Sequence, residues 1–174
     1  MKDVKIVLLG YMGSGKTTIG KIVANHLNIK FLDLDDYIEQ QENMSVGLIF
    51  EKRGELYFRK KEREYLSQIF LTETNFVLSL GGGTPCFGDN MELVNEKTVN
   101  SFYLNISIDE LSKRLKLEKN QRPIIAHIKD NEMQEFIGKH LFERSFFYNK
   151  AHQKIKVNNN TPAEIANMII TTLV

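Results

Sequence analysis

Residues 10–17 read Gly-Tyr-Met-Gly-Ser-Gly-Lys-Thr, which fits G-x-x-x-x-G-K-[ST], the pattern of a phosphate-binding P-loop. A short apolar run over residues 4–9 precedes the motif and suits a buried parallel strand. A helical stretch over residues 17–27 follows it. Strand, glycine-rich loop and helix in this order are the context in which the pattern indicates a nucleotide site.

The motif supplies the groups that a nucleoside triphosphate requires. Its glycines let the backbone curl so that successive N–H groups point at phosphate oxygens, and the helix N-terminus adds positive potential. Lys16 is expected to reach the β- and γ-phosphates, and the Thr17 hydroxyl to bind Mg²⁺. A glycine-rich turn that binds nothing is the alternative, but such a turn does not require the Lys-Thr pair. The expected ATP-binding residues here are Gly13, Ser14, Gly15, Lys16, Thr17 and Thr18.

Composition places the chain among ordinary globular proteins. Its 174 residues, 42% hydrophobic and 26% charged, are enough for one domain with its own core. A net charge of +1 gives no reason to expect nucleic acid or an acidic membrane as a partner. The single cysteine, Cys86, cannot form an internal disulfide, and the run over residues 4–9 is too short to span a membrane. We expect one domain over residues 1–174, a cytoplasmic setting, and a monomer that binds small molecules.

Beyond residue 27 the hydrophobic pattern alternates between strands and helices. This repetition predicts an α/β fold in three layers, α/β/α, with about five parallel strands in the central sheet. Capping-box sequences at Ser107–Glu110 and Thr161–Glu164 indicate helix starts, the second with Pro162 at the first helical position. Further strands are expected at residues 31–34, 76–80, 99–104 and 154–157, and helices at residues 36–42, 45–52, 55–72, 89–96, 107–117, 132–149 and from 161.

Residues 116–130 interrupt this alternation, because they are strongly polar and have neither helical nor strand periodicity. A loop of this length in a compact domain is usually functional, so we expect a mobile lid. Arg122, followed by Pro123, lies in this loop. A lid arginine can contact the transferring phosphate in phosphoryl-transfer sites.

Two aspartates follow the short strand expected at residues 31–34. Asp33 and Asp35 are two residues apart, so on a strand their side chains lie on one face, at the end where α/β folds place ligands. One carboxylate could complete the Mg²⁺ shell, and the other could accept a proton from a hydroxyl. The alternative is a solvated turn with a helix cap, a role that suits Asp36. For Asp35 taken alone, the residues leave both interpretations open.

Other ionisable residues give weaker signals. Arg59 and Arg144 lie far apart in sequence, near the edges of the expected site, where each could also be a surface charge. Arg53 and Arg63 have no such context and are expected on helix surfaces. The four histidines show no metal-ligand spacing.

Taken together, these motifs resemble the shikimate kinase family along nearly the full length of the chain. The P-loop is shared by many ATPases, but its combination with Asp-x-Asp, Phe-Arg and a triple glycine is far more specific. The matching stretches are residues 10–20, residues 31–39 with Asp33 and Asp35, residues 45–62 with Phe58, Arg59 and Glu62, residues 79–83, Arg122 with Pro123, and Arg144 with Tyr148.

The resemblance implies ATP-dependent phosphorylation of the 3-hydroxyl of shikimate, a step in the chorismate branch of aromatic amino acid biosynthesis. It implies a substrate-binding helical region over about residues 33–62 and a lid over about residues 116–130. Asp35, Lys16 and Arg122 would be catalytic, with Asp35 as the candidate base. The other implied roles are Mg²⁺ binding by Thr17 and Asp33, carboxylate binding by Arg59 and Arg144 with Glu62 orienting Arg59, ring contacts from Gly81, Gly82 and Gly83, adenine contacts from Arg114 and Pro162, and phosphate contact by Arg122.

Two departures and two alternatives remain. Ala151 stands three residues after Tyr148 where the family usually has alanine at the fourth, which puts the end of that helix in doubt. Residues 159–161 read Asn-Asn-Thr where some relatives carry an arginine near the adenine. A gluconate or nucleoside monophosphate kinase would share the P-loop and lid, but would not explain the triple glycine with Arg59 and Arg144 as well. A catalytically silent nucleotide-binding module would not require Lys16, Thr17, Asp35 and Arg122.

Overall fold

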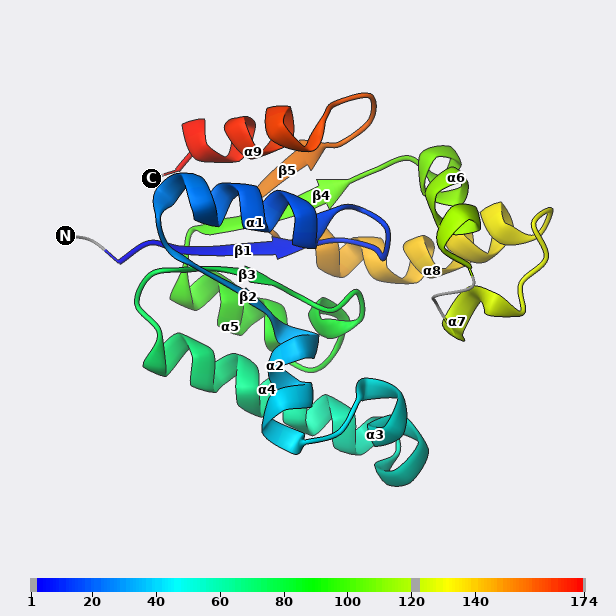
Figure 1. The fold of residues 1–174 in the computed structure, drawn as a ribbon, viewed down its shortest axis with the longest axis horizontal. Helices are drawn as coiled ribbons and strands as arrows, with labels where there is room; N and C mark the ends of the chain where they lie inside the picture. The colour runs from blue at the N-terminus through cyan, green and yellow to red at the C-terminus, as the bar shows by residue number, and fades with distance from the viewer. Residues whose placement is uncertain (1–2, 120–122, 174) are drawn as a thin grey trace.

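The computed structural model describes residues 3–119 and 123–173, which form a five-stranded parallel sheet with helices on both faces (Figure 1). The strand order is β2-β3-β1-β4-β5. The predicted three-layer α/β fold with about five parallel strands is confirmed. The strands are β1 (Lys5–Leu9), β2 (Lys30–Asp33), β3 (Phe76–Ser79), β4 (Asn100–Asn105) and β5 (Gln153–Lys156).

The helices divide between the two faces of the sheet. Helices α1 and α9 pack together on one face, and α4, α5 and α8 lie on the other (Figure 1). Right-handed crossovers explain why α1 lies on a different face from the later crossover helices, because the chain moves in one direction along the sheet from β1 to β2 and in the other direction afterwards. Helix α9 follows the last strand and belongs to no crossover. The helices are α1 (Lys16–Leu27), α2 (Leu34–Glu42), α3 (Val46–Arg53), α4 (Glu55–Thr72), the 3₁₀ turn η1 (Thr84–Cys86), α5 (Asn90–Lys97), α6 (Ile108–Glu118), α7 (Pro123–Ala126), α8 (Met133–Tyr148) and α9 (Pro162–Thr171).

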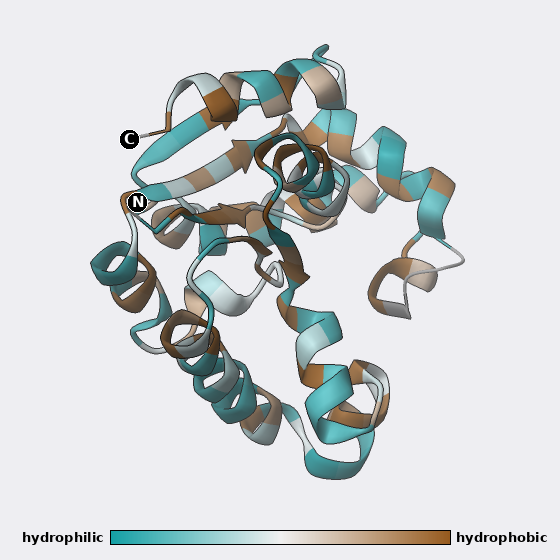
Figure 2. Ribbon diagram, turned by 60° about the vertical axis from the view of Figure 1, so that its left-hand side comes forward, coloured by the Kyte–Doolittle hydropathy of each residue, from teal (hydrophilic) through white to brown (hydrophobic). Residues whose placement is uncertain are grey.

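The central strands β1 and β3 are apolar because both of their faces are covered. Residues 6–9 of β1 and 76–78 of β3 are fully buried. Figure 2 shows this apolar interior in brown, between helices whose outer surfaces are largely teal. Within residues 3–119 and 123–173, no helix combines the length and the apolar content needed to cross a membrane.

The segments that leave the carboxyl ends of β1, β2 and β3 meet at one edge of the sheet. Ser79 at the end of β3 is in register with Leu8 of β1 and with Asp33 of β2. The P-loop, the Asp33 region and the glycines at residues 81–83 therefore emerge side by side. Ligands bind in open α/β sheets at this edge, where the strand order reverses.

The junction of β2 and α2 differs from the prediction. Strand β2 ends at Asp33 and α2 begins at Leu34, so the expected helix start at residue 36 is wrong. Asp33, rather than Asp36, is the N-cap, because Asp33 Oδ1 accepts the N–H of Asp35 at 3.1 Å. Asp35 lies in the first turn of α2, so the two carboxylates do not share a strand face.

The two predicted capping boxes have different outcomes. Thr161 and Glu164 form the complete reciprocal box at the start of α9. At α6, the Ser107 hydroxyl accepts the N–H of Glu110, but the Glu110 side chain does not accept the N–H of Ser107 in return. Glu110 pairs with Arg114 at 2.9 Å, and the Ser107 N–H donates to Asn158 Oδ1 at 3.0 Å. Glu110 therefore supports a side chain of the site instead of closing the box.

The segment expected to be an irregular lid contains more helix than predicted. Helix α6 continues to Glu118, and residues 123–126 form the single-turn helix α7. The side chain of Ile125 is fully buried, which explains how a polar stretch can hold one ordered turn. Arg122 lies outside the described residues.

Candidate active site

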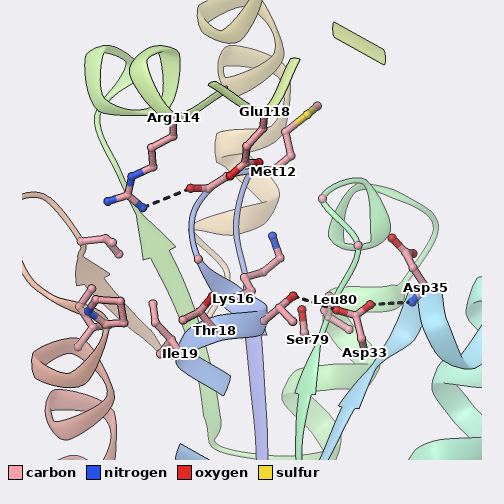
Figure 3. A pocket seen from close by; sticks show the side chains of 18 of the residues that line it. Met12, Lys16, Thr18, Ile19, Asp33, Asp35, Ser79, Leu80, Arg114 and Glu118 are labelled. Carbon is pink, nitrogen blue, oxygen red and sulfur yellow. Dashed lines mark hydrogen bonds between the residues drawn. The ribbon is translucent and has the colours of Figure 1, made fainter. Parts of the chain in front are cut away.

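Two adjoining cavities occupy the carboxyl edge of the sheet. The first has a volume of about 430 Å³ and is lined by the P-loop, α6 and the start of α9 (Figure 3). The second has a volume of about 320 Å³ and lies among α3, α4, α7 and α8. Four residues line both cavities: Met12, Asp35, Gly81 and Gly82. A group held in one cavity can therefore meet a group held in the other along this shared wall.

The first cavity has the features of a phosphate site. Helix α1 begins at Lys16 and points its N-terminus at the cavity, with Gly15 as N-cap at a φ of 92°. Glycine is required there because side chains rarely adopt that backbone conformation, and it leaves the first N–H groups of α1 open to an anion. Lys16 Nζ donates to the carbonyls of Gly10 at 2.9 Å and Tyr11 at 3.1 Å, which keeps the ammonium at the cavity mouth.

Most residues of the predicted ATP set line this cavity, and one lies beneath it. Gly13, Gly15, Lys16, Thr17 and Thr18 are on the wall. Ser14 has a fully buried side chain, and its N–H donates to the Tyr11 carbonyl at 3.2 Å. Ser14 is therefore placed to shape the loop from below.

Arg114 lies across the first cavity from the aspartates (Figure 3), and Pro162 also lines this cavity. Arg114 Nε donates to Glu110 Oε1 at 2.9 Å, and its Nη1 donates to the Gly13 carbonyl at 3.3 Å. Arg114 is thereby tied to the P-loop backbone. Asn160 lines the cavity together with Pro162. Glu118, on the last turn of α6, also lines it and was not predicted from the sequence.

The oxygen atoms of Thr17 and Asp33 suit a magnesium ion. Thr17 Oγ1 donates to Asp33 Oδ2 at 3.2 Å, so the two oxygen groups already lie together in the wall of the first cavity. Mg²⁺ prefers hard oxygen ligands and usually keeps several waters and phosphate oxygens beside one or two protein groups. In the described part of the chain, no group of three or more His, Cys, Asp and Glu side chains forms a metal cluster. The hydroxyl of Thr17 and the carboxylate of Asp33 are two oxygen groups of the kind that would hold Mg²⁺ together with a nucleotide.

Asp35 has unusual electrostatics for an aspartate. Burial raises its pKa to about 7, and the carboxylates of Asp33 and Glu62 act in the same direction, while Lys16 and Arg59 oppose them. A carboxylate with a pKa near the working pH is suited to accept a proton from a hydroxyl. Asp35 also lines both cavities, so it is available to a group held between them.

The second cavity combines two arginines with an apolar wall. Arg59 comes from α4 and Arg144 from α8, and the structure brings both to the same cavity. Two guanidinium groups suit a carboxylate, which arginine binds through a planar fork. The apolar wall is formed by Val46, Phe50, Phe58 and Ile124.

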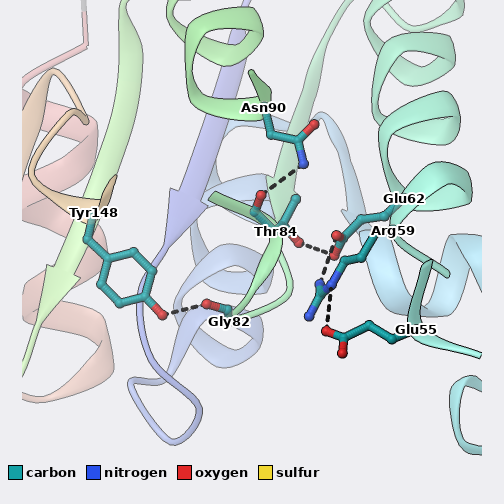
Figure 4. A network of polar contacts seen from close by, with 7 residues as sticks. All are labelled: Glu55, Arg59, Glu62, Gly82, Thr84, Asn90 and Tyr148. Carbon is teal, nitrogen blue, oxygen red and sulfur yellow. Dashed lines mark hydrogen bonds and ion pairs between the residues drawn. The ribbon is translucent and has the colours of Figure 1, made fainter. Parts of the chain in front are cut away.

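Arg59 is held by a buried carboxylate. Arg59 Nη1 donates to Glu62 Oε2 at 2.9 Å, and Arg59 Nε lies 3.5 Å from Glu55 Oε1 (Figure 4). Its guanidinium also lies 4.4 Å from the ring centroid of Phe87. Gly83 leaves room for it, because a Cβ at that position would lie 2.6 Å from Arg59 Nη2. The predicted pairing of Glu62 with Arg59 is present.

A hydrogen-bond network behind Arg59 was not predicted from the sequence (Figure 4). The Thr84 hydroxyl donates to Glu62 Oε1, and Asn90 Nδ2 donates to the Thr84 carbonyl at 2.9 Å. On the other side of the glycine loop, the Tyr148 hydroxyl donates to the Gly82 carbonyl. The only sequence signal was the position of Thr84 directly after the three glycines.

Comparison with known proteins agrees with this geometry. The family model described as "Shikimate kinase" matches residues 12–174. The shikimate kinase of Flavobacterium johnsoniae is 47% identical over 169 residues, covering 97% of this chain and 98% of the relative. The crystal structure of shikimate kinase from Bacteroides thetaiotaomicron has a TM-score of 0.89 at 40% identity and covers 97% of each chain.

Two further structures distinguish membership of the family from similarity of the fold alone. Shikimate kinase from Acinetobacter baumannii, solved in complex with shikimate, has a TM-score of 0.85 at 30% identity and covers 97% of this chain and 91% of its own. A gluconokinase from Sinorhizobium meliloti has a TM-score of 0.57 at 15% identity, so it shares the fold alone. The resemblance inferred from the sequence is confirmed: this chain belongs to the shikimate kinase family.

Proposed function

We propose that this enzyme transfers the γ-phosphoryl group of ATP to the 3-hydroxyl of shikimate, producing shikimate 3-phosphate and ADP for the chorismate branch of aromatic amino acid biosynthesis. The observation that carries the proposal is the shared wall of the two cavities. Asp35 lines the cavity of the P-loop and also the cavity of the two arginines. Donor and acceptor held in these cavities would meet beside Asp35, whose pKa is raised to about 7.

The acceptor cavity suits the chemistry of shikimate, a small anion with three hydroxyls. Arg59 and Arg144 bind the carboxylate, and the apolar wall and the backbone of residues 81–83 contact the ring. Asp35 accepts the proton of the attacking hydroxyl, or orients that hydroxyl if the transition state is loose and needs little base assistance. The planar fork of arginine gives this site its preference for a carboxylate.

The donor cavity suits ATP. The N–H groups at the start of α1 hold the phosphates, and Lys16 neutralises negative charge on the transferring group. Thr17 and Asp33 hold Mg²⁺, which neutralises phosphate charge when it is bound. Arg114 and Pro162 contact the adenine, and Arg122 contacts the phosphates.

The remaining expectations are part of the same proposal. They are a monomer and one catalytic domain over residues 1–174. ATP and shikimate are small cytoplasmic metabolites, so we place the enzyme in the cytoplasm, with neither nucleic acid nor membrane as a partner.

A coupled ADP-release assay with Mg²⁺ tests the proposal directly. We expect ADP release to depend on shikimate, and to remain at background with gluconate or AMP at the same concentration. Lys16→Ala should lower kcat by about 10²- to 10³-fold, as expected for loss of a charge-stabilising group, without unfolding the protein. ADP release that does not respond to shikimate, or that responds to gluconate or AMP instead, would contradict the proposal.

A further inference from the structure

Tyr11 connects the P-loop to α8 through its side chain. It is the second residue of the P-loop motif, yet its side chain is only 1% exposed. Its hydroxyl oxygen lies 2.8 Å from Nδ1 of His140. The guanidinium of Arg144 lies over the same tyrosine ring, 5.5 Å from the centroid. His140 and Arg144 are four residues apart on α8, so they lie on one face of the helix and Tyr11 contacts both.

The backbone of Tyr11 faces the other substrate. Its carbonyl accepts a hydrogen bond from Lys16 Nζ at 3.1 Å and another from the N–H of Ser14 at 3.2 Å. One residue therefore touches Lys16, which serves ATP, and Arg144, which serves the acceptor. The next residue, Met12, lines both cavities, so this part of the loop lies at their junction.

The protonation states suit a hydrogen bond between neutral groups. Burial raises the pKa of Tyr11 to about 12, so the hydroxyl keeps its proton. Burial and the charge of Arg144 lower the pKa of His140, so its imidazole is neutral near pH 7 and adds no positive charge beside Arg144. Either imidazole tautomer makes the contact, as acceptor or as donor at Nδ1. Phe136 packs on the imidazole at a centroid distance of 4.3 Å and limits its movement.

The two arginines of the acceptor cavity are therefore supported in different ways. Arg59 is held by ion pairs with Glu62 and Glu55. Arg144 lies over the face of the Tyr11 ring, which attracts a guanidinium without neutralising it, and it donates a hydrogen bond to the Tyr148 hydroxyl. Neither contact neutralises Arg144, so its guanidinium keeps its positive charge for a carboxylate ligand.

We propose that Tyr11 is a positioning residue for the acceptor: its ring and its hydrogen bond to His140 hold Arg144 toward the shikimate carboxylate and couple that arginine to the P-loop. The proposal rests on the proposed function, in which Arg144 binds the carboxylate. It assigns a role in acceptor affinity to a position of the P-loop whose side chain does not face the nucleotide.

Tyr11→Phe is the informative substitution, because it keeps the ring under Arg144 and removes only the hydroxyl. A net hydrogen bond of ordinary strength corresponds to about a 2- to 10-fold change. We expect the KM for shikimate to rise by about this factor, with kcat and the KM for ATP within about twofold of wild type. His140→Leu should have the same effect, and His140→Gln, which can still hydrogen-bond the hydroxyl, should retain most of the affinity.

A second measurement shows whether Tyr11 acts through Arg144. In an Arg144→Ala background, adding Tyr11→Phe should change kcat/KM for shikimate by less than about twofold, because the group that Tyr11 positions is gone. His152→Gln is the matched control. His152 Nδ1 makes a similar contact with the Ser101 hydroxyl at 2.9 Å, and neither residue lines the two cavities, so kinetic constants should not change.

The results separate this proposal from the proposed function. If the wild type does not phosphorylate shikimate, the proposed function fails. If the wild type does, the inference is overturned by any of three results: an unchanged KM for shikimate in both Tyr11→Phe and His140→Leu, an equal rise in the KM for ATP, or the same loss in the Arg144→Ala background as in the wild type.

Discussion

Asp35 shows how the site modifies a single residue. Its pKa of about 7 results first from burial and then from two neighbouring carboxylates. We expect kcat/KM for shikimate to rise as the pH increases through about 7, because only the carboxylate can accept a proton. Asp35→Asn should remove this pH dependence and lower kcat by about 10²- to 10⁴-fold, the usual contribution of a general base. Initial rates between pH 5.5 and 9 at saturating ATP measure both effects.

Thermal stability provides the control for this substitution. The pKa of Asp35 is about 7 in the folded protein against 3.8 for an unperturbed aspartate, so folding favours the protonated form. The stability that this preference contributes is present at low pH and lost as the pH rises through about 7. Asp35→Asn should therefore raise Tm relative to wild type at pH 8, and the two proteins should converge near pH 4. If Asp35→Asn lowers shikimate affinity more than it lowers kcat, Asp35 positions the attacking hydroxyl instead of accepting its proton.

At the residue scale, the sequence indicated the side chains that face the cavities better than the side chains that support them. Lys16 belongs to a short motif whose chemistry can be read locally, whereas Asp35 and Arg59 each left two interpretations open until the family resemblance implied their roles. Thr84 and Asn90 act on Glu62 through contacts that depend on η1 and α5 packing behind α4. A buried threonine carries no local signal of its partner, so this network could not be predicted.

At the scale of elements, α4 and α8 each contribute one arginine to a single cavity. Losing one charge-assisted hydrogen bond costs roughly 1.5–3 kcal/mol, which corresponds to about 10- to 150-fold in kcat/KM. We expect Arg59→Lys and Arg144→Lys each to cause a loss in this range for shikimate, because lysine cannot form the planar fork. Steady-state kinetics with shikimate varied at saturating ATP would measure it.

Calorimetric titration with ATP is the control for the two arginines, which lie outside the first cavity. ATP affinity should stay within about twofold of wild type in both variants. If ATP binding weakens as much as shikimate binding, the arginines serve the nucleotide or the fold, and a different acceptor returns as the rival hypothesis.

Element boundaries were predicted well where the hydrophobic periodicity was long, and poorly where several neighbouring residues could cap the same helix. The 18-residue helix α4 has the predicted bounds. The start of α2 was misplaced because the chain offers three aspartates at residues 33, 35 and 36, each a suitable cap. Only the end of β2, which is fixed by pairing with β3, selects Asp33.

At the scale of the whole molecule, the sheet order makes the site. The chain crosses from β1 to the edge strand β2 and returns past β1 to β4, which gathers three loops at one edge. Alternating strands and helices were enough to predict a parallel sheet with its ligands at that edge. The division into two cavities with a common wall depends on how α3, α4, α7 and α8 pack, which no local pattern encodes.

Ligand binding should slow amide hydrogen exchange around the two cavities, and the effect should be largest in α7. Ile124 lines the acceptor cavity although its side chain is 61% exposed, while the neighbouring Ile125 is fully buried. A single turn anchored by one side chain opens at low cost in free energy and can close over a bound acceptor. Closure would exclude water from the γ-phosphate and limit wasteful hydrolysis. We therefore expect amide hydrogen exchange over residues 123–130 to slow strongly when ADP and shikimate are bound together.

The internal reference for this experiment is β1, whose amides lie in the centre of the sheet and should exchange slowly with or without ligand. Shikimate alone should protect α7 less than both ligands do, because only the second ligand fills the other side of the shared wall. Hydrogen exchange followed by mass spectrometry resolves peptides of this length. Equal exchange over residues 123–130 in the free and the doubly liganded enzyme would mean that this segment is not a lid, and water would then have to be excluded by the walls of the two cavities themselves.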